Sequence, residues 1–438
     1  MKPAQARVPL ALVLLAAVFA GSPARAQAAT GGQAWTGSWA SSQQIPEPQN
    51  ALPADDLRDA TVRQIVRLSA GGATLRVHLS NVFGTAPLRF TSVHIARPVP
   101  APAAPPAAAG STGPPETPSL PASSAIEPGS DRALTFAGAP DVIVPAGAEY
   151  ISDPIDYAVA PLSSLAITFH LDAPPARETS HPGSRATTFY VHGDLVAAAD
   201  LPGAQHVDHW FQISGVDVLG PPGAGSVVAL GDSITDGHAT TTNGNDRWTD
   251  VLAERLQASP ATRAIGVLNA GIGGNHVLTD GLGPSALARF DRDVLAPAGA
   301  RWLIVFEGVN DLGGLAFRGD ATAADHEALV SRILAAYQQI VVRAHAHGIR
   351  AIGATLTPFA GSGFYHPGPA TEADRQAVNA WIRAPGHFDD VVDFDRVLRD
   401  PAHPDQLLPA YDCGDHLHPN PAGYRALGEA VPLSLFGP

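Results

Sequence analysis

Four short polar motifs in the second half of the chain carry the residue types that acyl transfer requires. Ser233 lies in a Gly-Asp-Ser sequence after an apolar run, and Asp415 and His418 are three residues apart near the carboxyl terminus. A serine hydroxyl is a weak nucleophile at neutral pH and needs an adjacent base, which a histidine held by a carboxylate supplies. Gly274 and Asn310 offer a backbone N–H and a side-chain amide to a developing oxyanion. The set predicts acyl transfer to a nucleophilic serine.

The elements that must position these residues follow from hydrophobic periodicity. Apolar runs of strand length at 227–230, 265–269, 302–306, 350–356 and 391–394 alternate with helical patterns at 247–257, 284–295, 324–347 and 372–382, before a last helix that starts near Pro421. Such alternation predicts a parallel sheet with helices on both faces. Ligands bind at the carboxyl ends of such strands, so the polar motifs are expected to meet at one edge. The first crossover lacks Gly-x-Gly-x-x-Gly, which argues against a dinucleotide.

Residues 31–220 predict an all-β domain that resembles a sandwich. Short alternating strands are expected at 61–68, 74–79, 91–96, 133–136, 165–171 and 187–191. The first two are separated by Gly71-Gly72 and are interpreted as a hairpin. Between residues 97 and 126 the sequence is rich in Pro and Ala, which predicts a disordered insertion within this domain.

The role of this β domain stays open between a carbohydrate-binding module, a part that shapes the active site and a stabilising accessory domain. Trp35, Trp39 and Trp210 would be sugar-stacking platforms in the first case, but buried core aromatics are the favoured interpretation.

The amino terminus predicts export. Charged residues precede an apolar stretch at 8–20, and Ala24-Arg25-Ala26 fits a cleavage site, so residues 1–26 are expected to form a signal peptide of a secreted or periplasmic protein. The stretch is too short to span a bilayer. The chain has 27 basic and 41 acidic residues; the leader holds three of the basic ones and no acid, which leaves a net charge of −17. This balance argues against nucleic acid or an anionic membrane as partner.

Cys413 is the single cysteine, so the chain forms no internal disulfide and no cysteine-based zinc site. We interpret it as a structural thiol rather than a nucleophile. His416 and His418 have a His-x-His spacing, but no third ligand stands in a fitting context, and neither a metal nor another cofactor is expected.

The motifs resemble those of the SGNH (GDSL-type) hydrolase superfamily. Its first, second, third and fifth blocks are matched in order by Gly231-Asp-Ser-Ile234, Asn269-Ala-Gly-Ile-Gly-Gly274, Gly308-Val-Asn-Asp311 and Asp415-His-Leu-His418. The resemblance implies a three-layer α/β/α flavodoxin-like domain over 226–438. It also implies Ser233 as nucleophile, His418 as base and Asp415 as its orienting carboxylate, with an oxyanion hole formed by Ser233 N–H, Gly274 N–H and Asn310.

Neighbouring polar residues compete for some of these roles. Asp412 is an alternative partner for His418, although the three-residue spacing favours Asp415. Asp232 and Asp311 are expected to support their loops. A substrate contact by Asn275 or His276 stays open.

Flanking sequences are similar to a xylan-esterase-like arylesterase/acylhydrolase branch, whose members carry an amino-terminal β domain. The similar stretches are Arg247-Trp-Thr-Asp-Val-Leu-Ala-Glu-Arg-Leu256, Trp35-Thr-Gly-Ser-Trp39 and Ser80-Asn-Val-Phe-Gly84. This similarity implies short-acyl esters of carbohydrates, acetyl esters above all, or aryl esters as substrates. The alternatives are a lipase or phospholipase-type acylhydrolase and a catalytically inactive glycan-binding protein. The sequence does not predict an oligomeric state.

Overall fold

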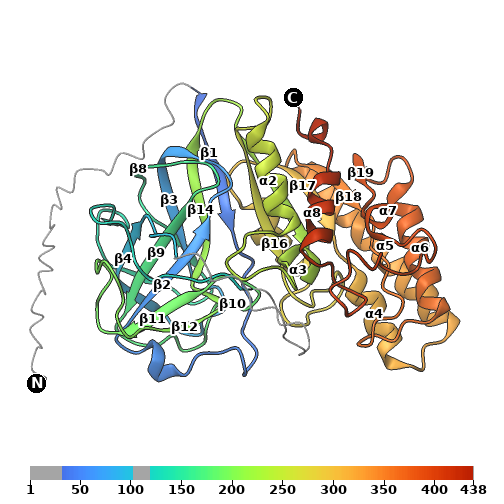
Figure 1. Cartoon of the computed structure of the whole chain (residues 1–438), viewed down its shortest axis with the longest axis horizontal. Helices are drawn as coiled ribbons and strands as arrows, with labels where there is room; N and C mark the ends of the chain where they lie inside the picture. The colour runs from blue at the N-terminus through green and yellow to red at the C-terminus, as the bar shows by residue number, and fades with distance from the viewer. Residues whose placement is uncertain (1–31, 102–118, 438) are drawn as a thin grey trace, which may run out of the picture.

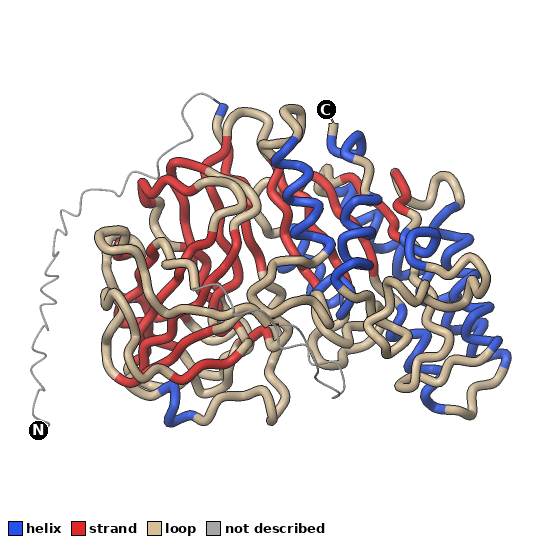
Figure 2. The backbone as a smooth tube through the Cα atoms, viewed as in Figure 1, coloured by secondary structure: helices blue, strands red, loops and turns tan. Residues whose placement is uncertain are grey.

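The computed structural model describes residues 32–101 and 119–437. The predicted signal peptide at 1–26 and the middle of the predicted insertion lie outside the described residues. Figure 1 shows a β region, residues 32–220, beside an α/β region, residues 225–437. Figure 2 shows that strands dominate the first region and that helices surround the sheet of the second.

The β region is a sandwich of two antiparallel sheets. One sheet has the order β1-β14-β3-β7, with β8 paired to β3, and the other has the order β12-β11-β2-β9-β4-β5, with β6 paired to β4. Val77 and Val216 from the first sheet meet Phe90 and Phe169 from the second in a shared core. The strands are β1 (Ala34–Ala40), β2 (Ala60–Arg67), β3 (Gly72–Ser80), β4 (Leu88–Ala96), β5 (Arg132–Ala133), β6 (Val142–Val144), β7 (Glu149–Ile151), β8 (Ile155–Val159), β9 (Ser164–Leu171), β11 (Thr188–His192), β12 (Gln205–Val207) and β14 (Ile213–Gly220).

The predicted hairpin around Gly71-Gly72 is wrong. β2 pairs with β9 and β11, whereas β3 pairs with β14, β7 and β8, so the connection crosses from one sheet to the other. Two strands in facing sheets show the same alternation as two paired strands, because both turn an apolar face to one core. A Cβ at Gly71 would lie 2.7 Å from Val159 O, so glycine permits this close crossing.

The ends of the predicted insertion belong to the fold. Pro98 forms a β-bridge with Ile126, which is buried, and Ser119 forms a bridge with Thr242 of the α/β region. The described residues of this segment therefore lie against the surrounding structure.

The α/β region contains a parallel sheet in the order β16-β15-β17-β18-β19. Counted along the chain, this order is 2-1-3-4-5, the arrangement of flavodoxin-like folds. The strands are β15 (Gly225–Gly231), β16 (Ile265–Gly271), β17 (Ala300–Phe306), β18 (Arg350–Ala354) and β19 (Asp390–Val392). One face packs against α2 (Trp248–Ala258), α7 (Phe394–Leu398) and α8 (Pro421–Ala430), and the other against α3 (Ala286–Phe290), α4 (Val309–Arg318), α5 (Ala323–Ala346) and α6 (Pro369–Arg383). The predicted three-layer fold is confirmed.

Some local elements differ from the sequence prediction. Helix α4 begins inside the Gly-Val-Asn-Asp motif and contains Gly313-Gly314, which lowers its intrinsic helix propensity and hides it from a periodicity search. The predicted helix at 284–295 is α3 followed by one π-helical turn, Asp291–Leu295.

The two regions meet along the edge of the parallel sheet. Ser69 Oγ accepts a hydrogen bond from Val267 N, in edge strand β16, at 2.8 Å, and Gly37 N donates to Ala298 O at 2.8 Å. A Cβ at Gly266 would lie 2.1 Å from Gly37 O, so the backbones approach closely. The β region thus satisfies and covers a sheet edge that would otherwise expose unpaired backbone groups.

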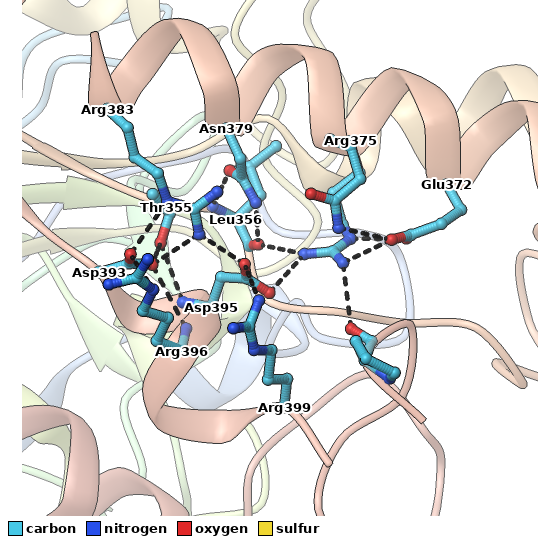
Figure 3. A network of polar contacts seen from close by, with 12 residues as sticks. Thr355, Leu356, Glu372, Arg375, Asn379, Arg383, Asp393, Asp395, Arg396 and Arg399 are labelled. Atoms are coloured by element: carbon cyan, nitrogen blue, oxygen red, sulfur yellow. Dashed lines mark hydrogen bonds and ion pairs between the residues drawn. The ribbon is translucent and has the colours of Figure 1, made fainter. Parts of the chain in front are cut away.

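A buried network of charged side chains fixes the chain after β18 (Figure 3). Arg375 in α6 and Asp395 in α7 are both fully buried, and Arg375 donates to Asp395 Oδ1 at 2.8 Å and to Leu356 O at 2.9 Å. Asn379 accepts from Leu356 N at 2.7 Å and donates to Leu356 O at 2.8 Å. The loop that leaves this anchor runs to Tyr365 at the candidate site.

Among the described residues, no helix has the length and apolar character needed to cross a bilayer.

Candidate active site

Ser233 is the first residue of α1 (Ser233–Asp236), a single helical turn that follows β15 directly. Asp232 caps this turn by accepting a hydrogen bond from Ile234 N at 2.9 Å. A Cβ at Gly231 would lie 2.6 Å from Phe306 O and 2.2 Å from Thr235 Oγ1, so only glycine permits so tight a strand-to-helix turn. The turn presents the Ser233 hydroxyl at the carboxyl edge of the parallel sheet.

Ser233, His418 and Asp415 form one hydrogen-bonded chain. Ser233 Oγ lies 2.8 Å from His418 Nε2, and His418 Nδ1 lies 2.6 Å from Asp415 Oδ2. The other oxygen of Asp415 accepts from the backbone N–H of Leu417 at 2.9 Å and of His418 at 2.8 Å. An ionised Asp415 therefore orients the ring so that Nδ1 carries its proton and Nε2 can accept the serine proton.

The carboxyl group of Asp415 is held ionised. Burial raises its pKa, but the hydrogen bond and charge of His418 and the two backbone N–H groups lower the pKa by more than burial raises it. The pKa of Asp415 therefore lies well below its ordinary value. Asp412, the alternative considered from sequence, instead pairs with His416, whose Nδ1 lies 2.7 Å from Asp412 Oδ2. The structure thus places Asp415, and not Asp412, against His418.

Gly274 and Asn310 line the same cavity as Ser233 and His418. Gly274, in the loop after β16, has φ +67°, a left-handed conformation that favours glycine. Asn310 in α4 accepts a hydrogen bond from Tyr365 Oη at 2.7 Å through Oδ1 and donates from Nδ2 to Asn275 O at 2.7 Å. These two bonds fix the amide orientation and leave one N–H of Nδ2 for a ligand.

The cavity has a volume of ≈ 670 Å³. Its apolar lining comes from Leu282, Phe364, Tyr365 and Leu417, and several glycines around Ser233 complete the wall. Phe364 also stacks on Phe317 at 5.7 Å between ring centroids, and both rings are exposed. The site therefore combines a polar catalytic centre with an apolar rim.

His238 is a site residue that the sequence analysis did not single out. Its ring centroid lies 4.0 Å from that of His418, and its Nδ1 accepts from Arg185 of the β region at 3.2 Å. Burial, assisted by the charges of His418 and Arg185, lowers the pKa of His238 to about 4. His238 is therefore neutral at neutral pH and adds no competing charge beside the base.

His238, Asp415 and His418 have ligand atoms within 4.8 Å of one another, a spacing that could hold a metal ion. However, Asp415 and His418 Nδ1 already bond to each other, and His418 Nε2 bonds to Ser233. The arrangement suits proton transfer better than metal ligation.

Three buried carboxyl groups, those of Asp232, Glu307 and Asp311, lie beneath the site. Asp311 accepts from Val277 N at 2.8 Å and from Leu278 N at 3.1 Å, which supports the neighbouring loop as expected. Burial and then the charge of Asp232 raise the pKa of Glu307 well above its ordinary value. Neither oxygen of Glu307 has a hydrogen-bond partner among the described residues. Burial and the neighbouring carboxyl groups therefore disfavour the ionised form of Glu307, although Arg289 Nη2 lies 4.0 Å from its Oε2.

Asn275 is fully buried and donates to Pro284 O at 2.8 Å, while its Oδ1 accepts from Arg289. Its side chain therefore holds the loop together and does not face a substrate. Arg247 and Trp248 are buried at the start of α2, as expected for residues that dock a helix.

The tryptophans do not form an exposed platform. Trp39 and Trp210 are buried and meet edge to face at 4.9 Å, and the Arg76 guanidinium lies 4.4 Å from the Trp35 ring. Cys413 is half-buried, and burial raises its thiol pKa to about 12, so the thiolate is not available as a nucleophile.

Comparisons with known proteins relate part of the chain to one family. Residues 229–426 match the model of the GDSL-like Lipase/Acylhydrolase family. The acetylxylan esterase Axe2 from Geobacillus stearothermophilus is 22% identical over 49% of this chain and 94% of its own, with a TM-score of 0.36. An acetyl xylan esterase named AlAXEase is 20% identical over 47% of this chain and 96% of its own, with a TM-score of 0.34. A GDSL-like lipase from Bacteroides thetaiotaomicron VPI-5482 is also 20% identical, over 47% of this chain and 84% of its own, with a TM-score of 0.33. No curated protein matches the chain in sequence.

Proposed function

We propose that Ser233 is the nucleophile of this chain. The premise is that the chain belongs to the GDSL-like lipase/acylhydrolase family through residues 229–426 and is a carboxylic ester hydrolase. The observation that carries this proposal is the continuous hydrogen-bonded chain from Ser233 Oγ through His418 to Asp415, with distances of 2.8 and 2.6 Å.

In the proposed mechanism Ser233 Oγ attacks the ester carbonyl carbon while His418 Nε2 takes the hydroxyl proton. The oxyanion accepts hydrogen bonds from Ser233 N–H, Gly274 N–H and Asn310 Nδ2. The tetrahedral intermediate collapses, and His418 returns the proton to the departing alcohol. A water molecule, deprotonated by His418, then attacks the acyl-enzyme, and the acid leaves as Ser233 regains its proton.

The proposed substrates are short-acyl esters of carbohydrates, acetyl esters above all, or aryl esters. The cavity supports this choice because a site of ≈ 670 Å³ lined by Leu282, Phe364 and Leu417 accommodates a small apolar acyl or aryl group. The proposal includes export by the signal peptide at 1–26, a β accessory domain at 31–220 and a catalytic domain at 226–438.

A lipase-type activity is the second candidate, because exposed apolar side chains surround the cavity. Leu282 and Phe364 line the cavity and are 49% and 64% exposed, and Phe317, which stacks on Phe364, is 63% exposed. Such a rim favours contact with longer acyl chains. An inactive glycan-binding role is less well supported, because Ser233, His418 and Asp415 are all present and lie within hydrogen-bond distance of one another.

A chain-length series of p-nitrophenyl esters, run beside acetylated xylan with wild-type protein and Ser233→Ala, tests the proposal. We expect kcat/KM to be highest for acetate, release of acetate from xylan, and no turnover by folded Ser233→Ala. A kcat/KM that rises steadily to long chains would favour the lipase alternative. Turnover by Ser233→Ala at the wild-type rate would overturn the serine mechanism.

A further inference from the structure

The carboxylate of Asp236 joins three parts of the molecule. Asp236 is the last residue of α1, and its backbone N–H donates to Asp232 O at 2.8 Å, so it shares one helical turn with Ser233. Its Oδ2 accepts from the backbone N–H of Gly273 at 3.0 Å, and Oδ1 lies 2.8 Å from Nε2 of His181 in the β region. Asp236 is 5% exposed and His181 is 3% exposed, so water does not compete for these bonds.

His181 is itself held rigidly by the β region. It lies in β10 (Ser180–His181), which pairs with β13 (Trp210–Phe211). Its Nδ1 lies 2.7 Å from Ser42 O, which only accepts, so Nδ1 donates there and the ring presents Nε2 to Asp236 Oδ1. The ring stacks on Trp210 at 5.7 Å, and Trp210 packs on Trp39 within the sandwich core.

The segment after His181 is fitted closely to the same helical turn. A Cβ at Gly183 would lie 1.9 Å from Asp236 Oδ2, so any larger residue there displaces the carboxylate. Arg247 Nε donates to Asp236 O at 2.7 Å, and its Nη2 donates to Ser184 O. The β region and the nucleophile turn therefore form one continuous packed unit.

From these contacts we infer that the β region takes part in catalysis: His181, acting through Asp236, positions the Gly273–Gly274 segment that donates to the oxyanion. His181 and Asp236 are positioning residues, and the inference rests on the proposed function of that site. A glycine-rich loop has wide conformational freedom, and a donor accelerates the reaction only when its direction is fixed beforehand. The bond to Gly273 N–H fixes the Ile272–Gly273 peptide, which is the neighbour of the Gly273–Gly274 peptide that carries the donor.

The inference predicts a specific kinetic signature. The bound ester has no oxyanion, which develops only in the transition state and the tetrahedral intermediate. Loss of the donor's alignment should therefore lower kcat and leave KM nearly unchanged. In His181→Ala we expect kcat for p-nitrophenyl acetate to fall at least tenfold, with KM within threefold of wild type. Binding of phenylboronic acid, which forms a tetrahedral adduct with an active-site serine, should weaken in proportion to kcat. Asp236→Asn, which keeps an acceptor for Gly273 N–H, should retain more kcat than Asp236→Ala.

His170→Ala is the matched control. His170 is also a buried histidine of the β region, with Nε2 3.1 Å from Asp59 Oδ1 and Nδ1 2.6 Å from Thr91 Oγ1, but it makes none of the contacts at the site. We expect its kcat to remain within twofold of wild type. A similar loss of kcat in both histidine variants, or wild-type kcat in folded His181→Ala, would overturn the inference.

If His181→Ala is not recovered in folded form, Gly183→Ala decides the question, since it displaces the same carboxylate by steric contact. A fall in its kcat at unchanged KM supports the inference, and wild-type kcat overturns it. Ser233→Ala separates this outcome from the proposed function: if it abolishes turnover while these variants are unaffected, only the role of the β region fails.

Discussion

The amide of Asn310 is oriented by a phenol that comes from a different loop. Tyr365 Oη donates to Asn310 Oδ1 at 2.7 Å, and Tyr365 is buried against Phe359 and Phe364. With its oxygen bonded to Tyr365 and one N–H bonded to Asn275 O, the amide keeps its second N–H for a ligand in the cavity. Tyr365 thus helps to determine the direction of a donor that the proposed mechanism requires.

Substitutions of Asn310 and Tyr365 should lower kcat by different amounts. Asn310→Ala removes an oxyanion donor and should lower kcat by about 10²- to 10³-fold. Tyr365→Phe keeps the ring but removes one orienting hydrogen bond, worth about 1 kcal/mol, and should lower kcat by about fivefold. Steady-state kinetics on p-nitrophenyl acetate measures both. A larger loss in Tyr365→Phe than in Asn310→Ala would contradict the assignment of Asn310 as the donor.

The buried carboxyl groups make stability depend on pH. Burial, and then the charge of Asp311, raise the pKa of Asp232 to about 7 against an opposing hydrogen bond from Ile234 N. Since its pKa in the unfolded chain is about 4, the folded state binds a proton that the unfolded state releases between about pH 4 and 7. The stability that Asp232 contributes is therefore full at low pH and is lost as the pH rises through this window.

Asp232→Asn removes this dependence. The free energy of unfolding of the variant, minus that of wild type, should be larger at pH 8 than at pH 5 in urea titrations. Asp153→Asn is the control: hydrogen bonds from Gly138 N, Thr135 and Ala137 N outweigh the effect of burial and lower the pKa of Asp153, so it is ionised at both pH values. For Asp153→Asn, the difference in free energy of unfolding from wild type should be the same at pH 5 and pH 8. An equal difference at both pH values for Asp232→Asn would contradict the argument.

Local motifs could predict some residues of the site and not others. Ser233, Gly274, Asn310, Asp415 and His418 lie in short sequences whose spacing reflects a turn or loop, and the structure brings them to one cavity. His181, His238 and Tyr365 act through contacts between segments far apart in the chain. No local pattern marks them, and none gave a role to Asp236, which follows Ser233 by three residues.

At the scale of elements, the network in Figure 3 anchors the loop that carries Tyr365. Arg375 and Asp395 have no exposed side-chain surface, and Asp395 also bonds to Arg383 at 2.5 Å. A buried ion pair adds little compared with an apolar contact, but removal of one partner leaves the other charge buried and uncompensated.

Asp395→Ala should therefore lower the free energy of unfolding by about 3–5 kcal/mol, measured by urea denaturation at neutral pH. Arg396→Ala is the matched control in the same network, because the Arg396 side chain is 70% exposed and pairs with Asp393 at 3.3 Å. We expect the control to change stability by less than about 1 kcal/mol. If Arg396→Ala lost as much free energy of unfolding as Asp395→Ala, burial would not determine how much each ion pair matters for stability.

Periodicity predicted the elements of the α/β region better than it predicted the pairing of strands in the β region. Strands buried on both faces and long helices such as α5 have strong patterns, and strict β–α alternation allows few topologies. In a sandwich, alternation fixes which face of a strand is apolar but not which sheet the strand joins. That is why the crossover at Gly71-Gly72 looked like a hairpin.

At the scale of the whole molecule, the β region is continuous with the α/β region. Four residues, 221–224, link β14 to β15, Ser69 satisfies the edge of β16, and His181 reaches the nucleophile turn. Sequence composition predicted two regions of different class. It could not predict their interface, because that interface depends on the close approach of the Gly37 and Gly266 backbones and of Gly183 to the Asp236 side chain.

The nucleophile can be identified directly by reaction of the full-length protein with a fluorophosphonate, followed by intact-mass measurement and peptide mapping. We predict a single adduct on Ser233, its absence in Ser233→Ala, and labelling slowed by about 10²-fold or more in His418→Ala, which lacks the base. An adduct on another residue, or undiminished labelling of Ser233→Ala, would contradict the account.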